Sequence, residues 1–321
     1  MALAALTLAA LNARAWADPL AFVTDQGADA LAIVDLAQGR VTETVKIGKK
    51  PAGVAVAPGA KRIFASNPEG HSVSFVELQP DGTHRSVAEL PVGEGPLGLA
   101  LDAKGERLFV ADWYTDLVYV VDVAKREVTG QITVGKSPSG MVASPDGKFL
   151  YVANRESDTL SVVNLSTLKS EIEIPVGKAP FGVTYDASGP EGPRLFIANV
   201  KSADVSVVDP LARRETRRLK VRAFPYAVAV TKDGSRFFVT NQHDDSISAF
   251  DGRSYAELGV IAACGYPEGI LISPDQREAL AACWMDDQLV AIEVQSLKVT
   301  RKIAVGASPR AFGQFIAPDA K

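Results

Sequence analysis

Short apolar stretches alternate with turn-forming residues along almost the whole chain. Four such stretches follow one another in residues 140–144, 149–154, 159–164 and 171–176. The third alternates apolar and polar residues, which is typical of a β-strand. The turn Pro145-Asp146-Gly147 separates the first two, with Pro presetting φ and Gly supplying a positive φ. The pattern therefore predicts four short strands in about 42 residues and no long helix.

This unit occurs seven times, and three rows of residues repeat in phase. Apolar tetrads end at Asp25, Asn67, Asp112, Asn154, Asn199, Asn241 and Cys283. Ten residues after each tetrad stand Asp35, Glu77, Asp122, Asn164, Asp209, Asp251 and Glu293. A proline, usually followed two residues later by glycine, stands at Pro51, Pro96, Pro138, Pro180, Pro225, Pro267 and Pro309. Every step is 42 or 45 residues, which indicates a closed repeat fold.

Four strands per repeat and seven repeats predict an all-β, seven-bladed β-propeller with four antiparallel strands per blade. The chain begins at a second strand and ends after a first strand, so the C-terminal strand is expected to join the N-terminal three. This closure would leave no open end. The innermost strands are expected at 52–57, 97–102, 139–144, 181–186, 226–231, 268–273 and 310–316.

The tetrads also resemble those of a known family. Tyr151-Val152-Ala153-Asn154 and Phe238-Val239-Thr240-Asn241 nearly spell the name of the YVTN-repeat β-propellers. The resemblance covers residues 20–316, and it implies the propeller fold. It also implies an exported bacterial protein, since seven-bladed members of this family are commonly exported and have no established chemistry.

The N-terminus favours export independently. A short apolar run at 2–11 precedes Ala15-Trp16-Ala17, a small-x-small pattern typical of a signal-peptidase site. No Lys or Arg precedes the run, so the true start could lie upstream. We therefore expect a signal peptide at 1–17, a single propeller domain at 18–321 and a periplasmic or otherwise exported protein. No stretch is apolar for long enough to predict a transmembrane segment.

Composition and charge narrow the class of protein. The chain has 321 residues, of which 47% are hydrophobic and 22% charged, and its net charge is −4. A nucleic-acid-binding protein usually carries a basic surplus on one patch. The only run of like charge is basic and spans residues 213–220, so we expect no nucleic-acid partner.

The two ends of the channel differ in their loops. The proline loops and the loops after the tetrads are expected on one face, here called the proline face, and the PDG-type turns on the opposite turn face. Two three-residue insertions, in 79–85 and 186–194, both map to the turn face. The proline face keeps uniform loops, which makes it the expected platform for a ligand.

Side chains that differ between repeats should surround the channel mouth on the proline face. The residues after each proline are Ala52, Leu97, Ser139, Phe181, Tyr226, Glu268 and Arg310. Neighbouring loops add Trp113, Tyr114, Arg155, Glu156, Lys201, Gln242, His243, Trp284, Met285 and Asp286. Exposed aromatic residues tend to mark interaction sites, so Phe181, Tyr226, Trp113 and Trp284, if exposed together, favour binding. The alternative is that each loop position varies freely without a function.

The only two cysteines, Cys264 and Cys283, are both expected at the proline face. In an oxidising compartment they could form a disulfide, and two unlinked buried thiols are the alternative. A third hypothesis adds His243 and Met285 to make a site for copper or another soft metal. No close ligand spacing supports that site, and no cofactor is predicted.

Catalytic motifs are absent from the sequence. His71 and His84 have no evident partner, and the Asp and Asn of the repeated rows occur in every blade, so they are expected to cap turns. We therefore expect a periplasmic, non-catalytic binding or scaffold propeller with an unknown protein or small-molecule partner at the proline face. The alternatives are an enzyme or accessory subunit of a quinone- or metal-dependent redox system, and a lactonase-like hydrolase. The sequence does not identify the ligand or the oligomeric state.

Overall fold

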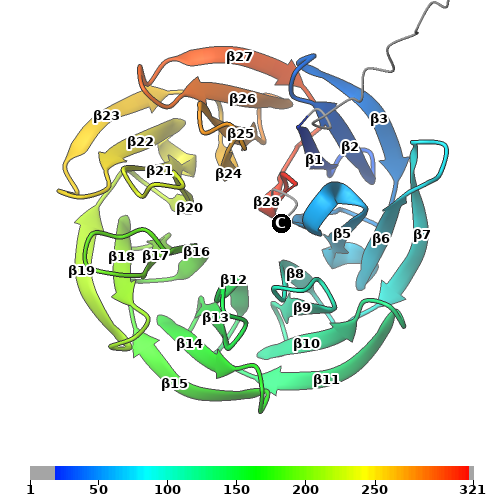
Figure 1. Cartoon of the computed structure of the whole chain (residues 1–321), viewed down its shortest axis with the longest axis horizontal. Helices are drawn as coiled ribbons and strands as arrows, with labels where there is room; N and C mark the ends of the chain where they lie inside the picture. The colour runs from blue at the N-terminus through cyan, green and yellow to red at the C-terminus, as the bar shows by residue number, and fades with distance from the viewer. Residues whose placement is uncertain (1–18, 318–321) are drawn as a thin grey trace, which may run out of the picture.

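The computed structural model describes residues 19–317, which form a seven-bladed β-propeller around a central channel (Figure 1). The predicted fold class is confirmed. The predicted signal peptide at 1–17 lies outside the described residues. None of the helices in the described part of the chain is long and apolar enough to cross a membrane.

The strands follow the repeat. The first three are β1 (Leu20–Asp25), β2 (Ala30–Asp35) and β3 (Arg40–Lys46). The next two blades contain β4 (Gly53–Val56), β5 (Arg62–Asn67), β6 (Ser72–Leu78), β7 (His84–Pro91), β8 (Pro96–Leu101), β9 (Arg107–Asp112), β10 (Leu117–Asp122) and β11 (Glu127–Thr133). Then come β12 (Pro138–Ala143), β13 (Phe149–Asn154), β14 (Thr159–Asn164), β15 (Lys169–Pro175), β16 (Pro180–Asp186), β17 (Arg194–Asn199), β18 (Asp204–Asp209) and β19 (Arg214–Lys220). The last are β20 (Pro225–Val230), β21 (Arg236–Asn241), β22 (Ser246–Asp251), β23 (Glu257–Ala262), β24 (Pro267–Ile272), β25 (Glu278–Cys283), β26 (Gln288–Glu293), β27 (Val299–Ala304) and β28 (Phe312–Gln314), with short 3-10 turns η1 (Pro58–Ala60), η2 (Pro68–Gly70) and η3 (Gln242–Asp244).

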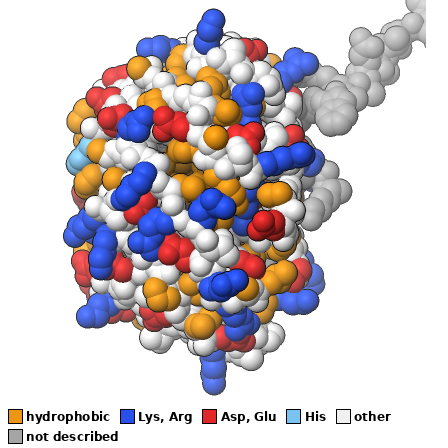
Figure 2. All heavy atoms as spheres, turned by 90° about the vertical axis from the view of Figure 1, so that its left-hand side faces the viewer, with side chains coloured by type: hydrophobic (Ala, Val, Ile, Leu, Met, Phe, Trp, Pro, Cys, Tyr) orange, Lys and Arg blue, Asp and Glu red, His pale blue; other side chains and the backbone are white. Residues whose placement is uncertain are grey.

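Each complete blade runs outward from the channel. Figure 1 shows β8, β12, β16, β20 and β24 nearest to the centre and β11, β15, β19, β23 and β27 at the circumference. The second strand of each complete blade is almost wholly buried, because neighbouring blades cover both of its faces. The outermost strands mostly expose their residues and bury few. On the side shown in Figure 2, Lys and Arg are interspersed with Asp and Glu.

The glycine that stands two residues after most of the repeat prolines allows the inner strands to approach one another. A Cβ on Gly182 would lie 2.5 Å from the carbonyl oxygen of Tyr226 in the next blade, and one on Gly98 would collide with the carbonyl of Ser139. Close backbone approach is a common reason for a glycine inside a strand. The Pro-x-Gly row is therefore structural, and the inner strands lie within two residues of their predicted bounds.

The C-terminal segment closes the ring as predicted, but with an irregular ladder. It lies antiparallel to β1, with bridges from Asp25 to Pro309 and from Ala21 to Ile316. Between these bridges β28 turns toward the channel and pairs in parallel with β4. Positive φ angles at Ala311 (51°) and Gly313 (107°) interrupt the regular strand there.

The repeated polar residues hold turns and strand ends, as expected. The Asp122 carboxylate accepts hydrogen bonds from the backbone N–H groups of Ala124 and Lys125. The Asn154 side chain donates to the hydroxyls of Thr159 and Ser161 on the neighbouring strand, at 3.0 and 2.8 Å. The Asn154 contacts lie at the proline face, whereas the Asp122 turn connects β10 and β11 at the turn face. The loops that contain both insertions connect strands at the opposite, turn face.

Candidate functional site

A cavity of about 340 Å³ opens at the channel mouth on the proline face. Its described lining residues are Gln26, Lys50, Pro68, Glu69, Gly95, Leu97, Trp113, Tyr114, Arg155, Phe181, Val200, Phe224, Tyr226, Gln242, Tyr266, Glu268 and Arg310. Ligand pockets are typically about 300 Å³ or larger, with apolar walls and a few placed polar groups. The structure thus brings Phe181, Tyr226, Glu268, Arg310, Trp113, Tyr114 and Arg155 together at one cavity.

Eight of the lining residues were not predicted from the sequence, and three of them, Lys50, Phe224 and Tyr266, share one position in the repeat. Each immediately precedes a repeat proline and adopts a left-handed conformation, with φ between 50° and 59°. The Asp245 carboxylate accepts a hydrogen bond from the backbone N–H of Tyr266 at 2.9 Å, and Asp29 does the same for Lys50. The loop backbone is therefore fixed, while the side chain before the proline is free to differ. This variation between repeats is visible in the sequence, and it could have identified the residue before each proline as a candidate lining residue.

Aromatic rings form the floor and wall of this cavity. The Phe181 ring lies 4.2 Å from the Tyr226 ring and 6.0 Å from the Trp113 ring, centroid to centroid. Phe312, from the closing segment, packs 4.8 Å from Phe181 and 5.4 Å from Tyr226. Of these three contacting rings, Phe181 and Tyr226 line the mouth cavity and Phe312 lines a second cavity, so the cluster separates the two.

The expectation that these aromatic residues are exposed together is wrong. Phe181 and Tyr226 are each only 6% exposed, because they point into the channel and pack on one another. Trp113 and Trp284 are half-buried. Tyr114 alone of the predicted aromatic residues is fully exposed, at 73%. The aromatic surface is therefore the inside of a cavity and not an open patch.

A buried ion pair lies at the base of the cavity. The Glu268 side chain is 1% exposed, and its Oε2 lies 3.7 Å from Nε of Arg310, which is 27% exposed. Gln242 Nε2 donates to Glu268 Oε1 at 3.2 Å, whereas Glu268 Oε2 and Arg310 Nε have no hydrogen-bond partner among the described residues. Burial raises the pKa of the Glu268 carboxyl to about 7, although the neighbouring Arg310 acts to lower it. Buried polar atoms are usually hydrogen-bonded, so this pair beside the cavity is a candidate contact for a bound group.

Cationic side chains stand at the rim. The Arg155 guanidinium lies 5.2 Å above the Trp113 ring, a cation–π contact. Neither Arg155 nor Lys50 forms an ion pair with another residue in the 19–317 range. With Arg310 they make three basic side chains against two acidic ones, Glu69 and Glu268, so the lining carries a positive surplus.

His243 and Trp284 lie beside the cavity and not in its lining. The His243 ring stacks on Phe224 at 3.7 Å, and its Nε2 is 3.3 Å from the Tyr266 hydroxyl. The Trp284 ring packs 5.6 Å from the Tyr266 ring, centroid to centroid. Both residues therefore support lining side chains, and we expect neither to touch a ligand directly.

Cys264 and Cys283 form a disulfide in the structure, with Cα atoms 5.9 Å apart. This pairing leaves neither sulfur free to act as a thiolate ligand. Within residues 19–317 there is no group of three His, Cys, Asp or Glu residues arranged to hold a metal, and Met285 is 62% exposed. The geometry gives no support to the soft-metal hypothesis for His243, Cys264, Cys283 and Met285.

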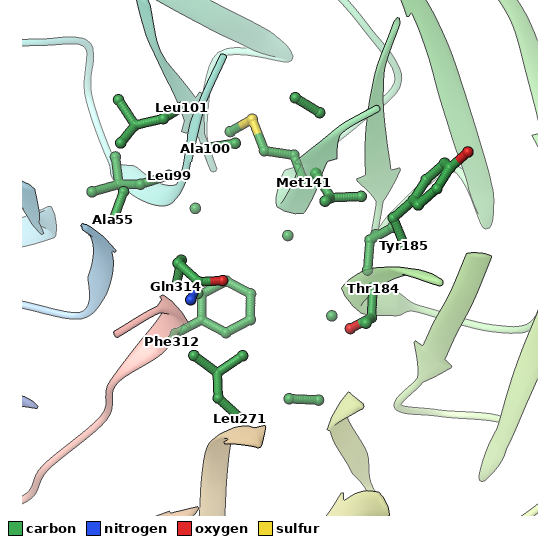
Figure 3. Close-up of a pocket in the computed structure, with 18 of the residues that line it drawn as sticks. Ala55, Leu99, Ala100, Leu101, Met141, Thr184, Tyr185, Leu271, Phe312 and Gln314 are labelled. Carbon is green, nitrogen blue, oxygen red and sulfur yellow. The ribbon is translucent and has the colours of Figure 1, made fainter. Parts of the chain in front are cut away.

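The second cavity, of about 360 Å³, occupies the turn-face end of the channel (Figure 3). Backbone and apolar side chains such as Leu99, Met141 and Leu271 form most of its wall. Figure 3 shows the Phe312 ring projecting among the inner strands, beside Gln314. The two ends of the channel therefore differ in chemistry, because, of these two cavities, only the proline-face one has Lys, Arg or Glu in its described lining.

Comparison with known families agrees with this architecture. The model of the YNCE-like β-propellers matches residues 15–145 and 197–317. The chain belongs to the YNCE-like β-propeller family. A seven-bladed β-propeller lactonase model also matches this YNCE-like chain, over residues 122–220. The resemblance to YVTN repeats stays a prediction, and no curated protein matches the sequence.

Solved structures share the fold of this YNCE-like propeller at low identity. A functionally unknown protein from Desulfotomaculum acetoxidans is 13% identical, with a TM-score of 0.75 over 92% of this chain and 99% of that one. A putative 6-phosphogluconolactonase from Bacteroides uniformis is 15% identical, with a TM-score of 0.76 over 91% and 98%. The dihydro-heme d1 dehydrogenase NirN is 16% identical, with a TM-score of 0.70 over 94% and 77%. At such identities the likeness concerns the fold alone.

Proposed function

We propose that this YNCE-like propeller is an exported, non-catalytic binding module that takes a small molecule into the proline-face cavity. The observation that carries the proposal is the buried Glu268–Arg310 pair, in which a carboxylate oxygen and a guanidinium nitrogen have no hydrogen bond within the described residues and lie beside an aromatic-walled cavity. Unpaired buried polar atoms are costly, and a bound ligand would satisfy them.

The lining favours binding over group-transfer chemistry. Ser, Cys, Thr and Lys nucleophiles act when an activating group lies within reach. The described lining residues include no Ser, Thr, Cys or His, and the one Lys, Lys50, stands at the rim. The aromatic rings and the two arginines are instead the residue types that are enriched at binding surfaces.

Export is supported by two features that are independent of the cavity. Ala15-Trp16-Ala17 matches a signal-peptidase site, and the Cys264–Cys283 geometry suits a disulfide. Disulfides persist in oxidising compartments such as the periplasm. We therefore expect cleavage after residue 17 and a mature protein without free thiols.

The proposal is tested by blocking the mouth. Val200→Trp and Gln26→Trp each place a large ring in the lining from a different blade, and Leu211→Trp adds the same ring to an exposed turn. Purified mature proteins are mixed with a small-molecule extract of periplasm and examined by native mass spectrometry. We expect a retained small molecule on the wild type and Leu211→Trp but not on the two blocked variants. The absence of any retained molecule on the wild type, or equal retention by all four proteins, would refute the proposal.

One observation favours a second candidate, a lactonase-like hydrolase. A carboxyl with a pKa of about 7 is suited to general acid–base catalysis at neutral pH, and the lactonase model matches residues 122–220. This candidate predicts turnover of a panel of sugar and aliphatic lactones, with loss of the activity in Glu268→Gln. The binding proposal predicts no turnover by either protein.

A further inference from the structure

Resting on this proposed function, we infer that the cavity ligand is a planar aromatic carboxylate, with its carboxylate on Arg310 and its ring among the aromatic side chains. The inference joins three independent features of the cavity, namely its shape, its aromatic walls and its sign of charge. Each of them restricts the chemistry of the ligand in a different way.

The walls favour a flat, unsaturated ring. Trp113, Phe181, Phe224, Tyr226 and Tyr266 all contribute to the lining, and they come from four different blades. Aromatic pairs gain from offset-stacked and edge-to-face contact beyond their burial of surface. The cavity of about 340 Å³ is roughly twice the size of a ~150 Å³ cavity that accommodates benzene, so a ligand of two fused rings fits.

The charges favour an anion. Arg155 and Lys50 have no ion-pair partner in the described part of the chain, and Arg310 Nε makes no hydrogen bond. A planar guanidinium matches a carboxylate in a two-point geometry, whereas a cationic ligand would have to pass Lys50 and Arg155 at the rim and then meet Arg310. The single negative charge of the exposed Glu69 at the rim does not balance these positive charges.

Binding of such an anion must be coupled to protonation of Glu268. Four groups face this carboxyl: Arg310 on the closing segment, Gln242 after β21, Tyr226 on β20 and Tyr266 before β24. Only Arg310 is cationic, so it cannot neutralise both Glu268 and a ligand carboxylate. The ligand carboxylate therefore pairs with Arg310 in place of Glu268. The Glu268 carboxylate then accepts a proton from solvent.

The pH dependence follows from this exchange. Burial holds the pKa of free Glu268 at about 7, and an adjacent anion raises it further. Below about pH 7 the carboxyl is already neutral and binding is at its strongest. Above about pH 7 the proton must be acquired, and the affinity falls by about tenfold per pH unit. Glu268→Gln mimics the neutral carboxyl, so its affinity should not depend on pH in this range.

The experiment uses isothermal titration of the mature protein with four probes of matched size. Naphthoate is the aromatic anion, naphthylmethanol the neutral form, naphthylmethylammonium the cation and decalin carboxylate the saturated anion. We expect naphthoate to bind at least about tenfold more tightly than the other three. The affinity should fall by about fivefold between about pH 7 and pH 8 in the wild type, because the carboxyl is half protonated at about pH 7, and stay constant in Glu268→Gln.

Charge variants locate the contact. Arg310→Gln should abolish naphthoate binding, and Lys50→Gln with Arg155→Gln should weaken it several-fold without touching the buried pair. Lys302→Gln, on the exposed outer strand β27, removes one positive charge elsewhere and should have no effect. If Arg310→Gln does not fold, the rim variants and Glu268→Gln still test whether the cavity binds an anion with coupled protonation of Glu268.

Two outcomes overturn the inference. Equal or tighter binding of the neutral or cationic probe refutes the ligand class but leaves a small-molecule site in place. Binding of none of the probes also refutes the class. In that case the mouth-blocking variants decide separately whether the proposed function stands, because they require no knowledge of the ligand.

Discussion

Replacing Glu268 by Gln should change how the stability of the protein depends on pH. The pKa of the Glu268 carboxyl is raised by burial from its ordinary value of 4.5 to about 7 in the folded state. The folded protein therefore binds a proton more tightly than the unfolded chain does. The stabilisation from this group is fully present below about pH 4.5 and is lost as the pH rises to about 7.

The magnitude follows from the pKa difference. Each pKa unit corresponds to about 1.4 kcal/mol, so ionisation of Glu268 lowers the free energy of unfolding by about 3 kcal/mol. The Gln side chain carries no charge and still accepts the hydrogen bond from Gln242. Arg310 loses its partner in the variant, but it is 27% exposed and partly solvated, so the loss offsets only part of the gain.

The assay is urea unfolding of wild type and Glu268→Gln at about pH 5 and about pH 8, with Glu69→Gln as control. Glu69 is an exposed carboxylate on the same rim. We expect wild type and Glu268→Gln to be similar at about pH 5 and the variant to be more stable by about 1–3 kcal/mol at about pH 8. Parallel pH profiles for all three proteins would refute the argument that burial perturbs Glu268.

Three further predictions concern the scaffold. Thiol titration of the exported protein should find Cys264 and Cys283 oxidised, and their joint replacement by Ser should lower the free energy of unfolding by about 3 kcal/mol in the chain-entropy model. Phe312→Ala should cost about 3 kcal/mol in urea unfolding and join the two cavities in a crystal structure; a channel that stays divided would contradict the role of this ring. Gly182→Ala should lower the melting temperature, because its Cβ would stand 2.5 Å from the Tyr226 carbonyl oxygen; an unchanged melting temperature would contradict that close contact.

The sequence predicts the backbone well because the repeat constrains it. Seven phased tetrads and prolines determine how many blades form and which strands are innermost. Uniform spacing also places the loops that contain Arg155 and Trp113 on the proline face, where Glu268 lies. The closing segment was predicted to lie beside β1, and its parallel pairing with β4 was not, since it depends on the backbone bend at Ala311 and Gly313.

The chemistry of the cavity could be predicted only in part. The burial of Phe181 and Tyr226 depends on packing with Phe312, which is far away in the sequence and joins them only when the ring closes. The raised pKa of Glu268 likewise depends on how much of the carboxyl is buried. Repeat spacing predicts that these residues lie at the channel mouth. It does not predict the direction in which a side chain that differs between repeats points.

The most direct test of the account is a proton count during ligand binding. Naphthoate is titrated into the mature protein at about pH 8 in buffers that differ in ionisation enthalpy, which gives the number of protons taken up per ligand bound. We expect uptake close to one proton by the wild type and none by Glu268→Gln. Binding without proton uptake by the wild type, or equal uptake by both proteins, would contradict it.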